Sequence, residues 1–106
     1  MEVIFRISGK VLISCIRGDV DHHSALPLRQ AIDKSMKAFD CSDLVMDFSG
    51  VDFMDSSGIA VVMGTMRCAK EYSAGMRLIG VGQQPGKVLR AAGIERLMPL
   101  GQEMYI

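Results

Sequence analysis

The sequence lacks an excess of either charge. Its 106 residues include 12 basic and 12 acidic side chains, so the formal net charge is zero. A protein that binds nucleic acid usually gathers Lys and Arg on one face, where they neutralise phosphates. Because neither an excess nor a stripe of basic residues occurs, we expect no nucleic-acid partner.

Long apolar runs are also missing. No stretch reaches about 18 consecutive apolar residues, the length that a membrane-spanning helix requires, so we expect no membrane span. The segment Met1–Arg6 lacks the basic start and the long apolar core of a secretory signal. We therefore expect no secretory signal.

Cysteine is scarce, and the three that occur, Cys15, Cys41 and Cys68, are widely spaced. No Cys-x-x-Cys pair or Cys/His ligand spacing accompanies them, so we expect neither a disulfide framework nor a zinc site. A cytoplasmic location, where thiols stay reduced, fits this pattern better. Cys15 and Cys68 fall in predicted elements, and we interpret them as small core residues. Tryptophan is absent whereas methionine is frequent, with nine residues. The spacing of several methionines favours gap-filling in the core over a Met-rich binding surface.

Signatures of catalysis are absent as well. There is no G-x-S-x-G elbow, no Walker segment and no complete G-x-G-x-x-G, since Gly80-Val81-Gly82 lacks the third glycine. One nucleophilic arrangement stays open, with Ser56 or Ser57 as the nucleophile and His22 or His23 as its base. We expect a protein that is not an enzyme, with no catalytic residue, no cofactor and no metal.

Regular apolar patterns predict the elements. Residues alternate over 2–8 and over 11–17, and Gly9-Lys10 between them suits a type II′ turn, so the chain should open with a hairpin. Ser24 is a suitable N-cap for a helix whose apolar stripe runs from Ala25 to Phe39. The elements expected next are a strand over 44–48, a helix over about 57–72, a strand over 76–81, a short helix over 84–92 and a possible edge strand within 94–100. For the last six residues we expect at most about a turn of helix.

Two glycines of the second predicted helix invite an explanation. Gly64 lies inside it, where Gly costs about 1 kcal/mol relative to Ala, and close packing against the sheet is the expected reason. Gly75 is the candidate for the left-handed residue that ends this helix.

The expected order of elements is β-β-α-β-α-β-α. Strand-helix-strand connections of this length produce parallel neighbours through right-handed crossovers, whereas the hairpin adds an antiparallel strand. We therefore predict an α/β fold, a mixed sheet of four or five strands with helices packed mainly on one face, formed by a single domain over residues 1–106.

The stretch Val51–Ala60 holds the most chemistry. It connects a buried strand to a helix and contains Asp52, Asp55, Ser56 and Ser57 before Gly58. Helix capping by Asp55 or Ser56 is the simpler explanation, but it accounts for one oxygen and not for the whole cluster. A hydroxyl at an exposed helix N-terminus is also a good phosphate acceptor, because the free N–H groups and the helix dipole stabilise the added dianion.

A second polar segment, Asp21-His22-His23, leads into the first predicted helix. These neighbours do not make a metal site, because they cannot easily share one ion and no distant third ligand is evident. A solvated helix-entry loop is one interpretation. The other is a contact surface for a protein partner, since the loop and Ser56 should lie at the same end of the sheet.

At these residues a family resemblance emerges. The segment Asp47–Ile59 resembles the signature of STAS domains and, more narrowly, that of the bacterial anti-sigma factor antagonists (anti-anti-sigma factors). The segment Gly18–Ala25 resembles the loop that leads into the first helix of that family. The resemblance covers about Val3 to Leu100, and its specific part is Phe53–Gly58. The fold that it implies agrees with the predicted order of elements.

The resemblance implies a function and residues for it. In that family the serine after the signature Asp is phosphorylated, which corresponds here to Ser56, with Asp55 positioning it. The implied partners are an anti-sigma factor with serine kinase activity, which holds the ATP, and a serine phosphatase. The unphosphorylated form would bind the anti-sigma factor and release a sigma factor. The residues expected to contact the partner are Asp21, His22, His23, Ser24, Asp55, Ser57 and Gly58.

One departure and one alternative accompany this resemblance. Family members usually continue into a C-terminal helix, which we expect to be shortened or missing here, leaving apolar surface near Leu97 to Leu100 that self-association could cover. We therefore expect a monomer or a weak dimer. The alternative function is a STAS protein-interaction module of another signalling or transport assembly, without phosphorylation of Ser56.

Overall fold

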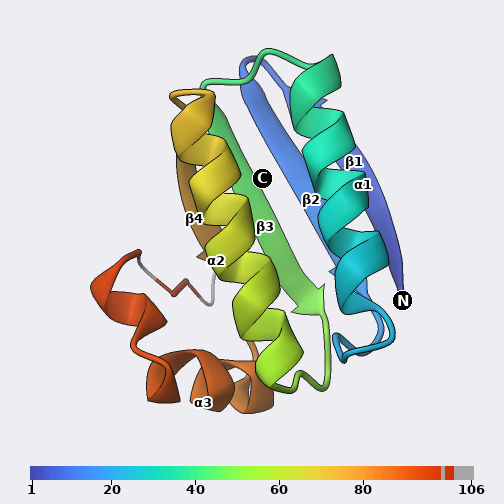
Figure 1. The fold of residues 1–106 in the computed structure, drawn as a ribbon, viewed down its shortest axis with the longest axis vertical. Coiled ribbons are helices and arrows are strands. Elements are labelled where there is room, and N and C mark those ends of the chain that lie inside the picture. Colours follow the sequence, from blue (N-terminus) through green and yellow to red (C-terminus); the bar gives the residue numbers. More distant parts are fainter. Residues whose placement is uncertain (99, 102–106) are drawn as a thin grey trace.

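A mixed sheet with helices on one face forms the fold (Figure 1). The computed structural model describes residues 1–98 and 100–101. Its elements are β1 (Glu2–Ser8), β2 (Val11–Arg17), α1 (Ala25–Ala38), β3 (Asp43–Gly50), α2 (Ser56–Glu71), β4 (Gly75–Ile79), α3 (Gln83–Ala91) and the 3₁₀ turn η1 (Ile94–Arg96). The predicted order of elements is confirmed.

The four strands lie side by side in the order β1-β2-β3-β4. β1 and β2 are antiparallel, whereas β2, β3 and β4 are parallel neighbours. The hairpin turns at Gly9, whose φ is +60°, while Lys10 keeps a negative φ. A positive φ at the first turn residue alone is the pattern of the predicted type II′ turn.

The core lies between the sheet and the two long helices, which cross the same face (Figure 1). Alternate residues of the central strands point into it, and α1 adds its apolar stripe. Its fully buried members include Leu12, Ile16, Leu28, Ile32, Leu44, Met46, Phe48 and Val62. Four methionines, Met36, Met46, Met54 and Met98, are buried, which confirms the gap-filling interpretation for them. Cys41 and Cys68 are buried and Cys15 is half-buried, as free thiols.

The glycine at position 64 is explained by a contact with α1 and not, as predicted, by close packing against the sheet. A Cβ at Gly64 would overlap the guanidinium of Arg29 on α1, not an atom of the sheet. Arg29 lies across this gap and pairs with Asp33 one turn along its own helix, with Nε 3.2 Å from Oδ1. The glycine therefore lets a long cationic side chain lie between the two helices.

The prediction that Gly75 ends the second helix is wrong. Ser73 takes the left-handed conformation, with φ of 55°, and Gly75 begins β4. The amide of Ala74 donates to Ala69 O at 2.8 Å and that of Ser73 to Lys70 O at 3.1 Å. These two bonds form a Schellman motif. In this motif the left-handed residue is the one whose amide bonds back to the last helical turn, so Ser73 takes that position although it is not a glycine.

The segment after α3 also differs from expectation. Ile94–Arg96 form a 3₁₀ turn instead of an edge strand, because Leu97 and Met98 donate back to Ile94 O. Among the described residues of this segment, Leu100 alone makes a bridge, parallel to Leu78 of β4. Leu97 is 54% exposed, so the predicted apolar surface is present there. The prediction for the last six residues falls almost wholly outside the described residues. Among the helices of residues 1–98, none is long and apolar enough to cross a membrane.

Candidate functional site

The chain between β3 and α2 is held in place by the loop that precedes α1. Val20 N donates to Phe53 O at 3.0 Å, and Asp55 N donates to Val20 O at 3.1 Å. Val20 and Met54 thereby form a short parallel bridge beyond the end of the sheet. A further bond joins Gly18 N to Gly50 O at 3.0 Å. The structure thus places the two polar segments of the sequence side by side, at the end of the sheet where α2 begins.

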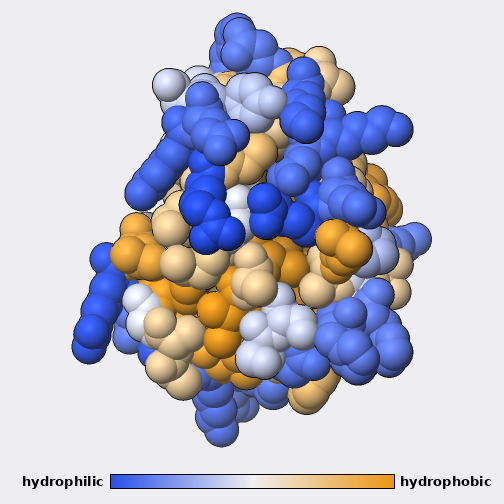
Figure 2. Space-filling model, in the orientation of Figure 1, coloured by the Kyte–Doolittle hydropathy of each residue, from blue (hydrophilic) through white to orange (hydrophobic). Residues whose placement is uncertain are grey.

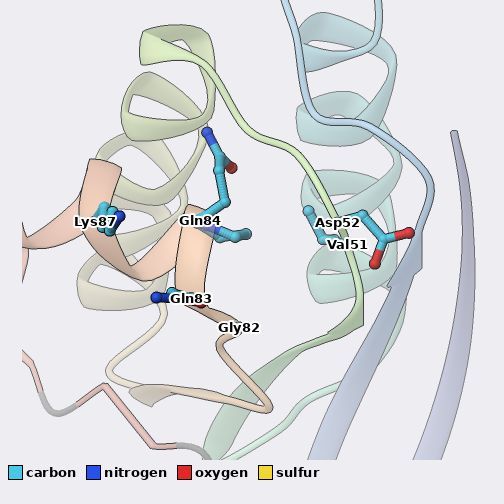
Figure 3. A pocket seen from close by; sticks show the side chains of 7 residues that line it. Val51, Asp52, Gly82, Gln83, Gln84 and Lys87 are labelled. Atoms are coloured by element: carbon cyan, nitrogen blue, oxygen red, sulfur yellow. The ribbon is translucent and has the colours of Figure 1, made fainter.

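On its other side the same chain is held by Gln84, a residue that sequence reasoning missed. Met54 N donates to Gln84 Oε1 at 2.8 Å, and Gln84 Nε2 donates back to Met54 O at 2.9 Å. Figure 3 shows the Gln84 side chain extending from the first turn of α3 toward this chain. The only sequence signal was its position, just after a parallel strand that ends at the same edge of the sheet.

Asp55 and Ser56 have different roles at the start of α2. Asp55 is the N-cap, in an extended conformation, and its Oδ1 accepts from Ser57 N at 2.8 Å. Ser56 is the first helical residue and is exposed. Among the described residues its hydroxyl has no hydrogen-bond partner. The carboxylate therefore caps the helix, and the serine oxygen stays available at the surface.

Gly58 has a supporting position beneath this turn. It is buried, and a Cβ there would overlap the side chain of Met54, with Sδ at 2.7 Å. Met54 is fully buried, so the missing Cβ lets its side chain fit under the first turn of α2. Gly58 was predicted to contact a partner, but it lies below the surface and shapes the turn from inside.

Ser24 is the N-cap residue of α1, as predicted, but its side chain makes no capping bond, and the carboxylate of Asp21 accepts the amides just before the helix instead. Asp21 Oδ1 accepts from the amides of His23 at 2.9 Å and Ser24 at 3.1 Å. The Ser24 hydroxyl donates backward to Asp19 O at 2.8 Å and makes no bond to the helix. The chain begins to turn three residues before α1, which explains why the Asp21 side chain, and not that of Ser24, accepts these amides. The amide of Ser24, and after it that of His23, holds the pKa of Asp21 below its usual value despite some desolvation.

A shallow groove of about 330 Å³ lies between the first turns of α1 and α2. It is mainly apolar and is lined by His22, Ala25, Leu26, Arg29, Ser57, Ala60 and Val61. Leu26 is 63% exposed, and Phe53 on the neighbouring chain is 45% exposed. In Figure 2, apolar residues gather over the lower half of the face, where α2 begins, and charged side chains dominate the upper half. The end of the molecule that carries Ser56 is thus its more apolar end on this face.

The histidines show no sign of an assembled catalytic site. The rings of His22 and His23 lie against each other, with centroids 4.0 Å apart. Both are exposed, and within the described part of the chain neither ring is hydrogen-bonded to a serine or to an orienting carboxylate. The groove does bring His22 and Ser57 to one surface, but as neighbours without a bonded relay. Residues 1–98 and 100–101 hold no cluster of metal-ligating side chains.

Comparison with known proteins identifies relatives over nearly the whole chain. A family model for the STAS domain matches residues 2–105. The anti-sigma F factor antagonist of Paenibacillus polymyxa is 28% identical over 90 residues, which cover 85% of this chain and 77% of that protein. The anti-sigma-B factor antagonist of Staphylococcus aureus is 21% identical over 87 residues, or 82% and 80% of the two chains.

Solved structures share the fold. An anti-sigma factor antagonist from Mycobacterium paratuberculosis superposes with a TM-score of 0.87 at 21% identity, covering 97% of this chain and 86% of that one. The antagonist SpoIIAA in its unphosphorylated form gives 0.80 at 22% identity, with 94% and 87% covered. Its phosphorylated form, from Bacillus, gives 0.71 at 22% identity, with 94% and 90% covered. At these identities the similarity establishes the fold alone. The role of each residue has to be argued from its contacts in this structure.

Proposed function

The chain belongs to the STAS domain family, and from that premise we propose that it is an anti-sigma factor antagonist controlled by phosphorylation of Ser56. Unphosphorylated, it binds an anti-sigma factor that is also a serine kinase, and a sigma factor is released. A serine phosphatase restores this form. The observation that carries the proposal is the exposed Ser56 hydroxyl, which no capping bond uses, at the first residue of α2.

The start of α2 favours a phosphate electrostatically. A phosphoserine at the first helical position lies beside the positive end of the helix dipole, an effect of roughly 0.3–1 kcal/mol at the surface. The cap of α2 belongs to the Asp55 carboxylate, which accepts from Ser57 N. Modification of Ser56 therefore removes no hydrogen bond that the described fold makes, and the protein can stay folded in both forms.

The surroundings of Ser56 explain how a phosphate would end binding. A partner that covers the groove between α1 and α2 must remove water from apolar surface that includes Leu26. A dianion of about −1.5 to −2 charges at the edge of that contact would have to lose hydration when the partner covers it. A penalty of roughly 3–4 kcal/mol weakens binding by a factor of about a hundred to a thousand.

The proposed docking surface combines the two polar segments with this groove. Asp21, His22, His23 and Ser24 form its α1 side, and Asp55, Ser56 and Ser57 form its α2 side, with Gly58 beneath. The backbone bonds between Val20 and the chain before α2 keep the two sides in register. Because the surface is rigidly assembled, we propose that partner choice depends on its shape and that phosphorylation changes only its charge.

Phosphopeptide mapping tests the proposal directly. The purified protein is incubated with its anti-sigma kinase and ATP, and the phosphate is expected on Ser56. Ser57→Ala removes the adjacent hydroxyl, and because Ser57 lies in the proposed docking surface its rate can fall, but the phosphate it does acquire should still map to Ser56, whereas Ser56→Ala should abolish phosphorylation. A phosphate on another residue, or undiminished binding by Ser56→Asp, would contradict the proposal. Asp is a weaker mimic than phosphate, so mapping is the decisive arm.

The remaining expectations complete the proposal. We propose that residues 1–106 form one domain that works in the cytoplasm as a monomer or weak dimer, with no cofactor, no metal and no nucleic-acid partner. It acts as a binding protein and not as an enzyme, since the kinase and its ATP lie in the partner. Sedimentation of the purified chain at two concentrations would measure the oligomeric state.

A further inference from the structure

A single side chain connects α3 to the chain that carries Ser56. Gln84, in the first turn of α3, accepts from Met54 N at 2.8 Å and donates to Met54 O at 2.9 Å. In an extended segment the N–H and C=O of one residue point to the same side, and those of its neighbours point to the other. Here the neighbours Phe53 and Asp55 bond to Val20. The segment therefore bonds to the backbone of Val20 on one edge. On its other edge, the side-chain amide of Gln84 makes the two bonds that a neighbouring strand would make.

We propose that Gln84 is a positioning residue for Ser56. It fixes Met54, two positions before the serine, and so sets the direction in which the chain enters α2. The biological meaning of this role rests on the proposed function. Its structural part can be measured on the protein alone, without any partner.

The chemistry of this contact is specific to a primary amide. Only Asn and Gln side chains carry a neutral donor and a neutral acceptor side by side, and Gln has the longer reach. Met54 is fully buried, so water cannot readily replace the hydrogen bonds of its N–H and C=O when Gln84 is removed. A buried backbone group without a partner is costly, and the chain must shift to regain one.

Gln84 lies on the wall of an open hollow of about 410 Å³, between the chain at Val51–Asp52 and the start of α3 (Figure 3). Its neighbour Gln83 has the same side chain in the same hollow, but it is exposed and makes no hydrogen bond among the described residues. The two glutamines therefore differ in one respect, the clamp on Met54. Gln83 is a matched control that the chain itself provides.

α2 has its own support, which makes the two parts of the site separable. Val61, Val62 and Ala69 bury the helix against the sheet, and Asp55 caps it locally. Loss of Gln84 should therefore loosen the chain before α2 without unfolding the helix. The effect should be largest at the amides of Met54 and Ser57 and small in the middle of α2.

Amide hydrogen exchange of the free protein tests the clamp. In Gln84→Leu we expect the Met54 amide to exchange at least tenfold faster than in the wild type, and the Ser57 amide to follow in the same direction. Gln83→Leu should leave both rates unchanged. Gln84→Glu should show a smaller loss of protection than Gln84→Leu at neutral pH, because its carboxylate can still accept from Met54 N but cannot donate to Met54 O. It should regain protection in acid, because a protonated carboxyl again offers a donor and an acceptor.

The kinase reaction tests the positioning role. With the anti-sigma kinase of the mapping experiment, Gln84→Leu should lower the rate of Ser56 phosphorylation about tenfold. The core variant Ile32→Val, which is destabilised at a fully buried site far from the turn, should retain the wild-type rate. Equal losses in the two variants would mean that Gln84 matters only for stability and would overturn the proposal.

The exchange data decide the inference even when the proposed function fails. If no kinase phosphorylates the wild-type protein, the function is wrong, and the Met54 and Ser57 amides still report whether Gln84 fixes the turn. Unchanged exchange at both amides in Gln84→Leu would overturn the inference whatever the kinase does. Faster exchange confined to these amides in Gln84→Leu, together with unchanged exchange in Gln83→Leu, would establish that Gln84 fixes the turn.

Discussion

The cap of α2 can be removed without touching the backbone bonds of the turn. Asp55 Oδ1 accepts from Ser57 N at 2.8 Å, whereas Asp55 N and O are held separately by Val20 O and Gly58 N. Replacing Asp55 by Ala deletes only the side-chain bond and the charge. Loss of an N-cap typically costs about 1 kcal/mol, and loss of the carboxylate near the helix dipole adds roughly 0.3–1 kcal/mol.

We therefore expect Asp55→Ala to lower the free energy of unfolding by about 1.5 kcal/mol. For a domain of this size that corresponds to a fall in Tm of roughly 6–9 °C. Urea denaturation followed by circular dichroism measures it, and the m-value should stay the same because the unfolded surface does not change. The midpoint should move to a lower urea concentration by roughly 0.5–1 M.

The variant Asp55→Asn separates the two contributions. Its amide oxygen can still accept from Ser57 N, but the charge is gone, so we expect a loss of about 0.5 kcal/mol. If Asp55→Ala were as stable as the wild type, the carboxylate would not cap α2. If Asp55→Asn were as unstable as Asp55→Ala, the charge and not the hydrogen bond would support the helix, and the division of roles between Asp55 and Ser56 would be wrong.

Two further substitutions test single features of the fold by the same urea assay. Thr65 is completely buried in α2, and within residues 1–98 and 100–101 its hydroxyl has no hydrogen-bond partner. Thr65→Val should therefore stabilise the protein by about 1 kcal/mol, and a loss of stability would reveal an unseen bond. Ser73 holds a left-handed conformation at the end of α2. Ser73→Gly should raise the free energy of unfolding by about 0.5–1 kcal/mol, whereas Ser73→Ala should not, and equal effects would refute strain as the cause.

The features that the sequence predicted well are those that depend on neighbouring residues. The hairpin turn at Gly9, the apolar stripe of α1 and the buried strand β3 each follow from a period or a turn residue visible within a few positions. The strand-to-helix turn was found for the same reason, because Asp55 and Ser56 stand directly before the apolar pattern of α2. Right-handed crossovers then brought the loop at Asp21 to the same end of the sheet.

The features that it missed depend on the reach of side chains across the fold. Gln84 bonds to Met54 across 30 positions of the chain, and no periodicity encodes that contact. The guanidinium of Arg29 explains Gly64 only when α1 and α2 are placed side by side. The N-cap of α1 was predicted at the right residue, Ser24, but the side-chain bonds before the helix were missed for a related reason. Asp21 and Ser24 are both good capping residues, and the backbone path between them decides which side chain accepts the amides.

Under the proposed function, the way the turn is held accounts for a switch that needs no refolding. The chain before α2 is fixed by Val20 on one side and Gln84 on the other, and the helix is capped by Asp55. All of these bonds avoid the Ser56 hydroxyl. A hydroxyl that capped the helix would lose its bond when phosphorylated, and the modification would then destabilise the turn as well as the interface. Because the part of the fold that the structure describes makes no use of this oxygen, the charge added to it can act on the partner alone.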